Sequence, residues 1–155
     1  MKIYLIGSLR NPQVPTLAAA LRLDGHDVFD DWYAAGPEAD DFWQKYEKAK
    51  GSTYPVALQG YAASHVFEYD KSHLDRCDVG VLLLPAGKSG HLELGYMLGQ
   101  GKRGYILVPE EVERWDVMYK FASGVFFTEK ELRDELSPPP PPPLTIRYVH
   151  ANDQF

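Results

Sequence analysis

Two acidic residues are spaced so that the elements around them could bring their carboxyl groups together. Glu93 lies three residues after Gly90, in the first turns of a segment with a helical pattern that follows an apolar run, residues 79–84. Asp70 lies near the end of the preceding helical segment. Two carboxyl groups at one crevice are the minimum set for displacement at an acetal-like carbon, because one attacks or stabilises the carbon and the other moves a proton. The alternative interpretation is that both are solvated surface charges.

A short polar loop follows the first apolar run of the chain, residues 2–6. It offers a glycine turn at Gly7, a hydroxyl group at Ser8 and a guanidinium group at Arg10, directly before a predicted helix. Such a set can hold a phosphate group or a sugar hydroxyl. Tyr4, within the apolar run, could hydrogen-bond a catalytic carboxylate, although a tyrosine in a strand is more often part of the core.

A second loop, residues 85–90, precedes the segment that carries Glu93. It contains Gly87, Ser89 and Gly90, and its glycine spacing is not that of a Walker motif. Alone, either loop is a weak signal. Their interest depends on whether the fold brings them to the same edge of a sheet.

The elements that must position these residues alternate between strands and helices. Alternation predicts an α/β domain with a parallel sheet and helices on both faces. Right-handed crossovers then favour a doubly wound five-stranded sheet of order 2-1-3-4-5, whose switch point lies between the two loops. The expected strands are 2–6, 26–30, 79–84, 104–108 and 124–127, and helices are expected before Gly25, over 40–50, 57–73 and 112–121, around Glu93 and up to Leu136 behind a capping box at Thr128.

An aromatic-rich insertion follows the second strand, whose end is strongly acidic at Asp30-Asp31. Such an insertion in a small α/β domain can close over a flat ligand, and Asp30 and Trp32 are therefore candidate substrate-binding residues. The other interpretation is that the aromatic side chains pack the insertion onto the body of the domain, and both can hold at once. The aromatic residues are Trp32, Tyr33, Trp43, Tyr46 and Tyr54.

Composition bounds the class of protein. The chain has 155 residues, 45% of them apolar, and a net charge of −6, which argues against a partner that is a nucleic-acid polymer or an anionic membrane. The single Cys77 offers no internal disulfide and no zinc framework, so no metal is expected. The apolar run at the amino terminus is too short for a signal peptide, so we expect a cytoplasmic protein.

The domain is expected to cover residues 1–137, because six prolines follow at 138–143. Such a run forms an extended polyproline segment. Residues 138–155 are therefore a separate segment and tail. The alternating apolar residues of the tail could add an edge strand to this subunit or a neighbour, and disorder is an equal alternative.

The motifs resemble those of the nucleoside 2-deoxyribosyltransferase family and of its relatives, the 2'-deoxynucleoside 5'-monophosphate N-hydrolases. The likeness covers roughly residues 1–108, and its most specific part is the Glu-Leu-Gly stretch. The motifs are Tyr4-x-x-Gly7-Ser8-x-Arg10, Asp70-x-x-x-Leu74-x-x-x-Asp78, Gly90-x-x-Glu93-Leu94-Gly95 and Gly101-Lys102.

The resemblance implies a flavodoxin-like sheet and cleavage of the N-glycosidic bond of 2'-deoxynucleosides. Glu93 matches the nucleophile that forms a covalent deoxyribosyl intermediate, Asp70 the aspartate that handles the proton of the base or orients the sugar, and Tyr4 the tyrosine that positions the glutamate. The implied partners are a deoxynucleoside or deoxynucleotide and a free nucleobase. No cofactor is implied, and a homo-oligomer is expected in which a neighbour completes the site.

The resemblance leaves the acceptor open. Ser8 and Arg10 match residues that hold the 5'-phosphate in the hydrolases, whereas Gly87 stands where those enzymes have a phosphate-binding serine and His91 replaces a small or apolar residue. Our first hypothesis is a transferase; the alternatives are a hydrolase that uses water and a binding module without catalysis. The expected substrate-binding set is Gly7, Ser8, Arg10, Asp30, Trp32, Gly87, Ser89, Gly90 and His91.

Overall fold

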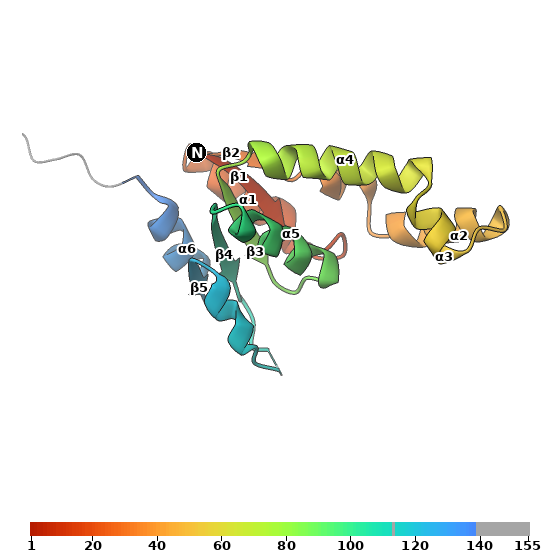
Figure 1. Ribbon diagram of the computed structural model, residues 1–155. Coiled ribbons are helices and arrows are strands. Elements are labelled where there is room, and N and C mark those ends of the chain that lie inside the picture. The colour runs from red at the N-terminus through yellow and green to blue at the C-terminus, as the bar shows by residue number, and fades with distance from the viewer. Residues whose placement is uncertain (113, 139–155) are drawn as a thin grey trace, which may run out of the picture.

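A five-stranded, all-parallel sheet forms the centre of the protein (Figure 1). The computed structural model describes residues 1–112 and 114–138. The strands run in the order β2-β1-β3-β4-β5, which confirms the predicted doubly wound, flavodoxin-like arrangement with its switch point between β1 and β3. Their bounds are β1 Lys2–Ile6, β2 Asp27–Phe29, β3 Val79–Leu83, β4 Arg103–Leu107 and β5 Gly124–Phe126.

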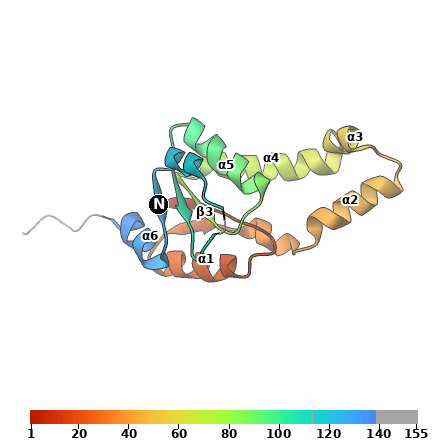
Figure 2. The same ribbon diagram turned by 90° about the horizontal axis from the view of Figure 1, so that it is seen from below.

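Helices cover both faces of the sheet, which is why β3 is buried along its whole length. Helices α1 (Gln13–Leu23) and α6 (Glu129–Leu136) pack on one face, and α4 (Tyr61–Arg76) and α5 (Lys88–Gly99) pack on the other (Figure 2). The capping box predicted before α6 is confirmed, since Thr128 and Glu131 each accept a hydrogen bond from the other's backbone N–H. The face covered by α4 and α5 carries Tyr4.

Small residues under α5 let that helix lie close to the sheet. Tyr4, Gly80 and Gly104 are partners in register on three neighbouring strands. A Cβ atom on Gly80 would lie 2.8 Å from the sulfur atom of Met97, and one on Gly104 would lie 2.7 Å from a methyl group of Leu94. The glycine pair therefore provides the space that α5 occupies beside Tyr4.

The insertion forms an arm that projects from the sheet (Figures 1 and 2). It begins with the 3₁₀ helix η1 (Asp31–Ala35) and continues through α2 (Ala39–Ala49) and α3 (Tyr54–Leu58) into the first half of α4. The prediction of one helix over 57–73 was wrong, because the chain turns at Gly60. This residue has an extended backbone, and its N–H donates to the carbonyl of Ala57. Glycine is a poor helix former and allows this break.

The segment after β4 is less helical than expected. The prediction of a helix over 112–121 holds only for its last turn, the 3₁₀ helix η2 (Val117–Phe121), which Asp116 caps by accepting a hydrogen bond from the N–H of Met118. The polyproline segment beyond Pro138 and the predicted edge strand lie outside the described residues. Among the helices that the structure describes, none is long and apolar enough to cross a membrane.

Candidate active site

Glu93 lies one and a half turns into α5 with its side chain half-buried. Burial, followed by the charge of Asp70, raises the pKa of Glu93 from 4.5 to about 7. A carboxyl group of this kind changes its charge near neutral pH. It therefore resembles the tuned acids of catalytic sites more than a solvated helix residue.

Gly90 sets the height of this part of α5 above the sheet. A Cβ atom at this position would lie 3.0 Å from Cγ2 of Ile6 and 3.1 Å from Cδ1 of Leu82. Both contacts are tighter than ordinary van der Waals distances, so a larger residue would push the helix away. The absence of a side chain at Gly90 thus keeps Glu93 near the carboxyl ends of β1 and β3.

Asp70 and Tyr4 complete a cluster with Glu93. Burial raises the pKa of Asp70, which lies half-buried in α4. Tyr4 is only 1% exposed, and its pKa lies well above the ordinary value because of burial and then because of the charges of Glu93 and Asp70. Each residue is close enough to another to change its ionisation, so the structure brings all three predicted residues together across β1, α4 and α5.

Asn11 joins the two loops at the switch point. This buried side chain donates from Nδ2 to the carbonyl of Leu84 at 3.4 Å and accepts at Oδ1 from the N–H of Gln13 at 3.0 Å. The second bond lies in the turn that leads into α1, whose first residue is Gln13, and the partner in the first bond lies 73 residues away in the sequence. Ser8 belongs to the same turn, where its Oγ accepts from the N–H of Arg10 at 3.2 Å.

The two charged residues expected to bind substrate have protein partners instead. Arg10 forms an ion pair with Asp41 of α2 at 2.8 Å and donates to the carbonyl of Pro37 at 3.2 Å. Asp30, whose side chain is 13% exposed, is paired with Arg22. The structure therefore places Arg10 at the base of the arm and Asp30 beside α1.

Trp32 and Gly7 pack against each other at the end of β1. The indole N–H of Trp32 donates to the carbonyl of Leu5 at 2.9 Å. A Cβ atom on Gly7 would lie 2.9 Å from Cγ2 of Val14 and 3.5 Å from the Trp32 ring. These contacts favour the packing interpretation of Trp32 that the sequence left open.

The loop before α5 is linked to η2 through His91. Nδ1–H of His91 donates to the carbonyl of Gly87 at 2.8 Å, and Nε2 of the same ring forms a hydrogen bond with the hydroxyl group of Tyr119 at 3.0 Å. The two rings also stack, with centroids 5.8 Å apart. Ser89, in contrast, is exposed on the first turn of α5. Sequence reasoning missed Tyr119, because nothing local to it indicates a partner 28 residues away.

An aromatic cluster lies beside the carboxyl groups and was also missed. Phe29, at the end of β2, is 5.0 Å from the Tyr4 ring and stacks on His73 of α4 at 3.8 Å. Tyr69 packs against His73 at 4.8 Å. The only signal of this aromatic cluster in the sequence was the helical spacing of Tyr69, Asp70 and His73, which places all three at neighbouring positions of one helix. Within the described residues, no group of three or more His, Cys, Asp or Glu side chains could hold a metal ion.

Comparisons with known proteins agree with this fold. No family model and no curated protein sequence matches the chain. Among solved structures, a 2-deoxyribosyltransferase from the psychrotolerant bacterium Bacillus psychrosaccharolyticus is similar, with 20% identity and a TM-score of 0.58 over 86% of this chain and 91% of that chain. A CMP N-glycosidase from Clostridium botulinum gives 14% identity and a TM-score of 0.49 over 88% and 98% of the two chains, too weak a match to carry an argument. The first likeness shows that the chain has the fold of a 2-deoxyribosyltransferase, as the motifs implied.

Proposed function

We propose that the protein cleaves the N-glycosidic bond of 2'-deoxynucleosides and transfers the deoxyribosyl group to another nucleobase. The observation that carries this proposal is the meeting of Glu93, Asp70 and Tyr4 on the α4–α5 face of the sheet, where the charge of Asp70 raises the pKa of Glu93 and both carboxyl groups raise the pKa of Tyr4. The shared fold and the sequence motifs support the same chemistry. Both are similarities to other proteins, so the activity is to be measured with this protein.

The reaction we propose proceeds in two displacements. An ionised oxygen of Glu93 forms a bond to C1' of the sugar while the bond from C1' to the base nitrogen breaks, and the electron pair of that bond leaves with the base. Asp70, in its protonated form, donates a proton to the departing base. The incoming base then attacks C1', its proton passes to Asp70, and the Glu93 carboxylate is released.

The raised pKa values of Asp70 and Tyr4 suit the roles that we propose for these two residues. Asp70 can hold a proton more readily than an ordinary aspartate because its carboxyl group is buried. Tyr4, in which burial keeps the hydroxyl group protonated, can donate a hydrogen bond to Glu93 and orient it. In the described part of the chain that hydrogen bond is not formed, so we assign it to the complex with substrate.

The surroundings of Arg10 favour a nucleoside over a 5'-monophosphate. A 5'-phosphate needs a cation that can turn toward it, and Arg10 is already paired with Asp41 and the carbonyl of Pro37. To bind a 5'-phosphate, Arg10 would have to leave these partners, so the hydrolase alternative is the less favoured of the two. A free base as acceptor, rather than water, remains our first hypothesis.

Exposed apolar side chains on the arm support a homo-oligomer as part of this proposal. Patches of this kind mark interaction surfaces on folded proteins. The stripe of α4 that packs on the sheet at Leu74 continues through Asp70 to Phe67, so a second copy seated on the arm would lie next to the site. The exposed apolar residues of the arm are Phe42, Tyr46, Tyr54, Val56, Leu58, Tyr61, Val66 and Phe67.

Incubation with a deoxynucleoside and a different free base tests the reaction. Chromatography should show a new deoxynucleoside. Base and free sugar alone would support the hydrolase. No base release across a broad panel of deoxynucleosides and their 5'-monophosphates would support the binding module without catalysis.

Glu93→Gln should lower the rate at least about 1,000-fold, because the nucleophile is lost. The control Glu111→Gln, which changes an exposed glutamate outside the site, should keep the parent rate.

A slow substrate identifies the nucleophile directly. A deoxynucleoside with fluorine at C2' should form a sugar adduct that accumulates, since fluorine destabilises the positive charge that develops on the sugar. Mass spectrometry of peptides should find the adduct on Glu93. An adduct on another residue, or unreduced activity of Glu93→Gln, would contradict the covalent mechanism.

A further inference from the structure

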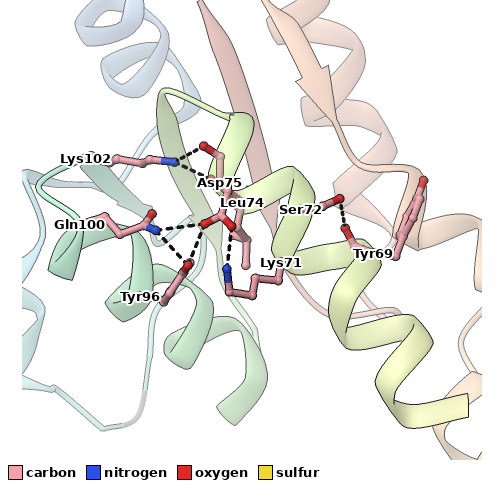
Figure 3. Close-up of polar contacts among 8 residues, drawn as sticks. All are labelled: Tyr69, Lys71, Ser72, Leu74, Asp75, Tyr96, Gln100 and Lys102. Carbon is pink, nitrogen blue, oxygen red and sulfur yellow. Dashed lines mark hydrogen bonds and ion pairs between the residues drawn. The ribbon is translucent and has the colours of Figure 1, made fainter. Parts of the chain in front are cut away.

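A polar cluster joins the end of α4 to α5 (Figure 3). It lies five residues after Asp70 on α4 and three residues after Glu93 on α5. The Asp75 carboxylate accepts hydrogen bonds from Lys71 Nζ at 2.6 Å, from the Tyr96 hydroxyl group at 2.7 Å and from Gln100 Nε2 at 3.0 Å. Gln100 also donates to the hydroxyl oxygen of Tyr96 at 2.9 Å. The carboxylate thus joins one residue of its own helix to Tyr96 of α5 and to Gln100, which caps the end of α5.

Lys102 strengthens the same junction from the loop after α5. Its Nζ donates to the carbonyl of Leu74 at 2.7 Å and to that of Asp75 at 2.8 Å. These carbonyls belong to the last turn of α4, where helical carbonyls lack partners and a cation is favoured. The end of α4 is therefore held both through a side chain and through its backbone.

The cluster lies on the two helices that carry the carboxyl groups of the site. Asp70 precedes Asp75 by five residues on α4, and Glu93 precedes Tyr96 by three residues on α5. Because helices are stiff over such short lengths, a displacement at the junction moves Asp70 relative to Glu93. Buried Leu74 adds only an apolar contact, which fixes direction less well than hydrogen bonds do.

Asp75 itself does not take part in proton transfer. Hydrogen bonds from Lys71, Tyr96 and Gln100 hold the pKa of Asp75 well below its usual range, so the group is ionised at neutral pH. Its side chain is also exposed. An ionised, solvated carboxylate with three donors serves to hold its partners in place.

We propose that Asp75 is a positioning residue, which sets the separation of Asp70 and Glu93 by fixing α4 against α5. The inference rests on the proposed function for its effect on rate, but its geometric part does not depend on activity. Loss of the junction should let α4 move outward. Water then reaches Glu93, and the charge of Asp70 acts on it from farther away.

Nuclear magnetic resonance titration of the Glu93 carboxyl group tests the geometric part on the full chain. The parent should show a midpoint near pH 7, and Asp75→Asn should show one at lower pH, because both causes of the raised pKa weaken together. Glu93→Gln identifies the signal. An unchanged midpoint in Asp75→Asn would overturn the proposal, even if the variant is less active.

Kinetics of the proposed transfer reaction supply the second readout. Asp75→Asn should lower kcat by about 10-fold or more with little change in KM, as expected when two catalytic groups move apart. Asp75→Glu, which keeps the acceptor, should recover part of the loss. A shifted Glu93 midpoint in a protein without transferase activity would retain the positioning role and reject the proposed function.

A matched ion pair on α6 serves as the control. Lys130 and Asp134 have the same spacing as Lys71 and Asp75, but this pair joins residues of one helix only. Asp134→Asn should leave the Glu93 midpoint and kcat unchanged, and an equal effect in both variants would overturn the inference. If circular dichroism shows that Asp75→Asn is unfolded, Tyr96→Phe removes a single donor and should give a smaller shift in the same direction.

Discussion

At the scale of single residues, the ionisation of Glu93 is the property on which the proposed chemistry depends. A nucleophilic carboxylate must be charged, yet burial and the charge of Asp70 both favour the neutral form. Asp70 in turn is protonated more readily than usual because of its own burial. Asp70 can therefore hold the proton that it gives to the departing base and takes back from the incoming base.

This coupling predicts a pH dependence with a definite sign. The proposed mechanism needs an ionised Glu93 and a protonated Asp70, so the active form of the pair carries one proton. For the parent, kcat/KM should therefore fall as the pH rises through about 7, where the pair loses that proton. In Asp70→Asn the neighbouring charge is gone and only Glu93 titrates, so the remaining activity should rise with pH, with a midpoint below that of the parent. This midpoint should stay above the ordinary value of 4.5, because burial is the larger cause.

The rate of Asp70→Asn should also fall by about 100-fold or more, since the proton donor is lost. The measurement is a profile of kcat/KM against pH for parent and variant at constant ionic strength. Asp116→Asn, which changes the exposed cap of η2, is the control and should keep the parent profile. A midpoint that does not move in Asp70→Asn would mean that the two carboxyl groups do not interact.

Residue types and short spacings were enough to predict that Glu93, Asp70 and Tyr4 lie together, because each lies on an element whose place in the sheet order could be predicted; their catalytic roles stay a prediction. They were not enough for Arg10, whose partner Asp41 lies 31 residues away in an insertion with no repeating pattern. The sequence around an arginine after a glycine turn is the same whether the arginine binds a ligand or pairs with an aspartate. The position of the arm, which brings Asp41 to Arg10, could not be predicted from the sequence.

At the scale of elements, the site depends on how closely α5 approaches the sheet. Short apolar runs predicted the strands, because strands buried on both faces are apolar along their length. The alternation of strands and helices with right-handed crossovers predicted their order. The break of the 57–73 helix at Gly60 and the restriction of helix in the 112–121 segment to η2, within the described residues, were missed, since both segments have apolar spacing compatible with a helix. In each case a tertiary contact or a turn overrides a weak local preference.

Gly90→Ala tests the approach of α5. The added methyl group would lie 3.0 Å from Ile6 and 3.1 Å from Leu82, so the free energy of unfolding should fall by about 1–3 kcal/mol, as in other overpacked cores. Urea denaturation measures this change, and kcat/KM should fall with it because Glu93 moves. Gly99→Ala, on the same helix with open space around it, should be neutral or slightly stabilising. Equal stability of the two variants would show that α5 does not need the close contact.

At the scale of the whole molecule, the arm is the feature that a single copy does not explain. The arm projects from the sheet (Figure 1), and many of its large apolar side chains are more than half exposed in the single chain. Composition alone could not predict this, because 45% apolar content is ordinary and the aromatic residues of the insertion were equally compatible with packing on the body. Their exposure favours an intermolecular role.

Phe67→Glu provides the test of a second copy on the arm. Phe67 is 65% exposed in the single chain, so the substitution should leave the free energy of unfolding of one copy nearly unchanged. In a dimer or larger oligomer, however, a buried carboxylate without a partner is strongly unfavourable. Light scattering coupled to size exclusion should therefore show an oligomer for the parent and a monomer for Phe67→Glu.

Leu23→Glu is the control. Leu23 lies on α1, outside the arm, and is 87% exposed, so this variant should have the same mass as the parent. Because Phe67 lies one turn from Asp70, loss of the oligomer should also lower transfer activity; a parent that is monomeric at micromolar concentration would reject the self-association we propose.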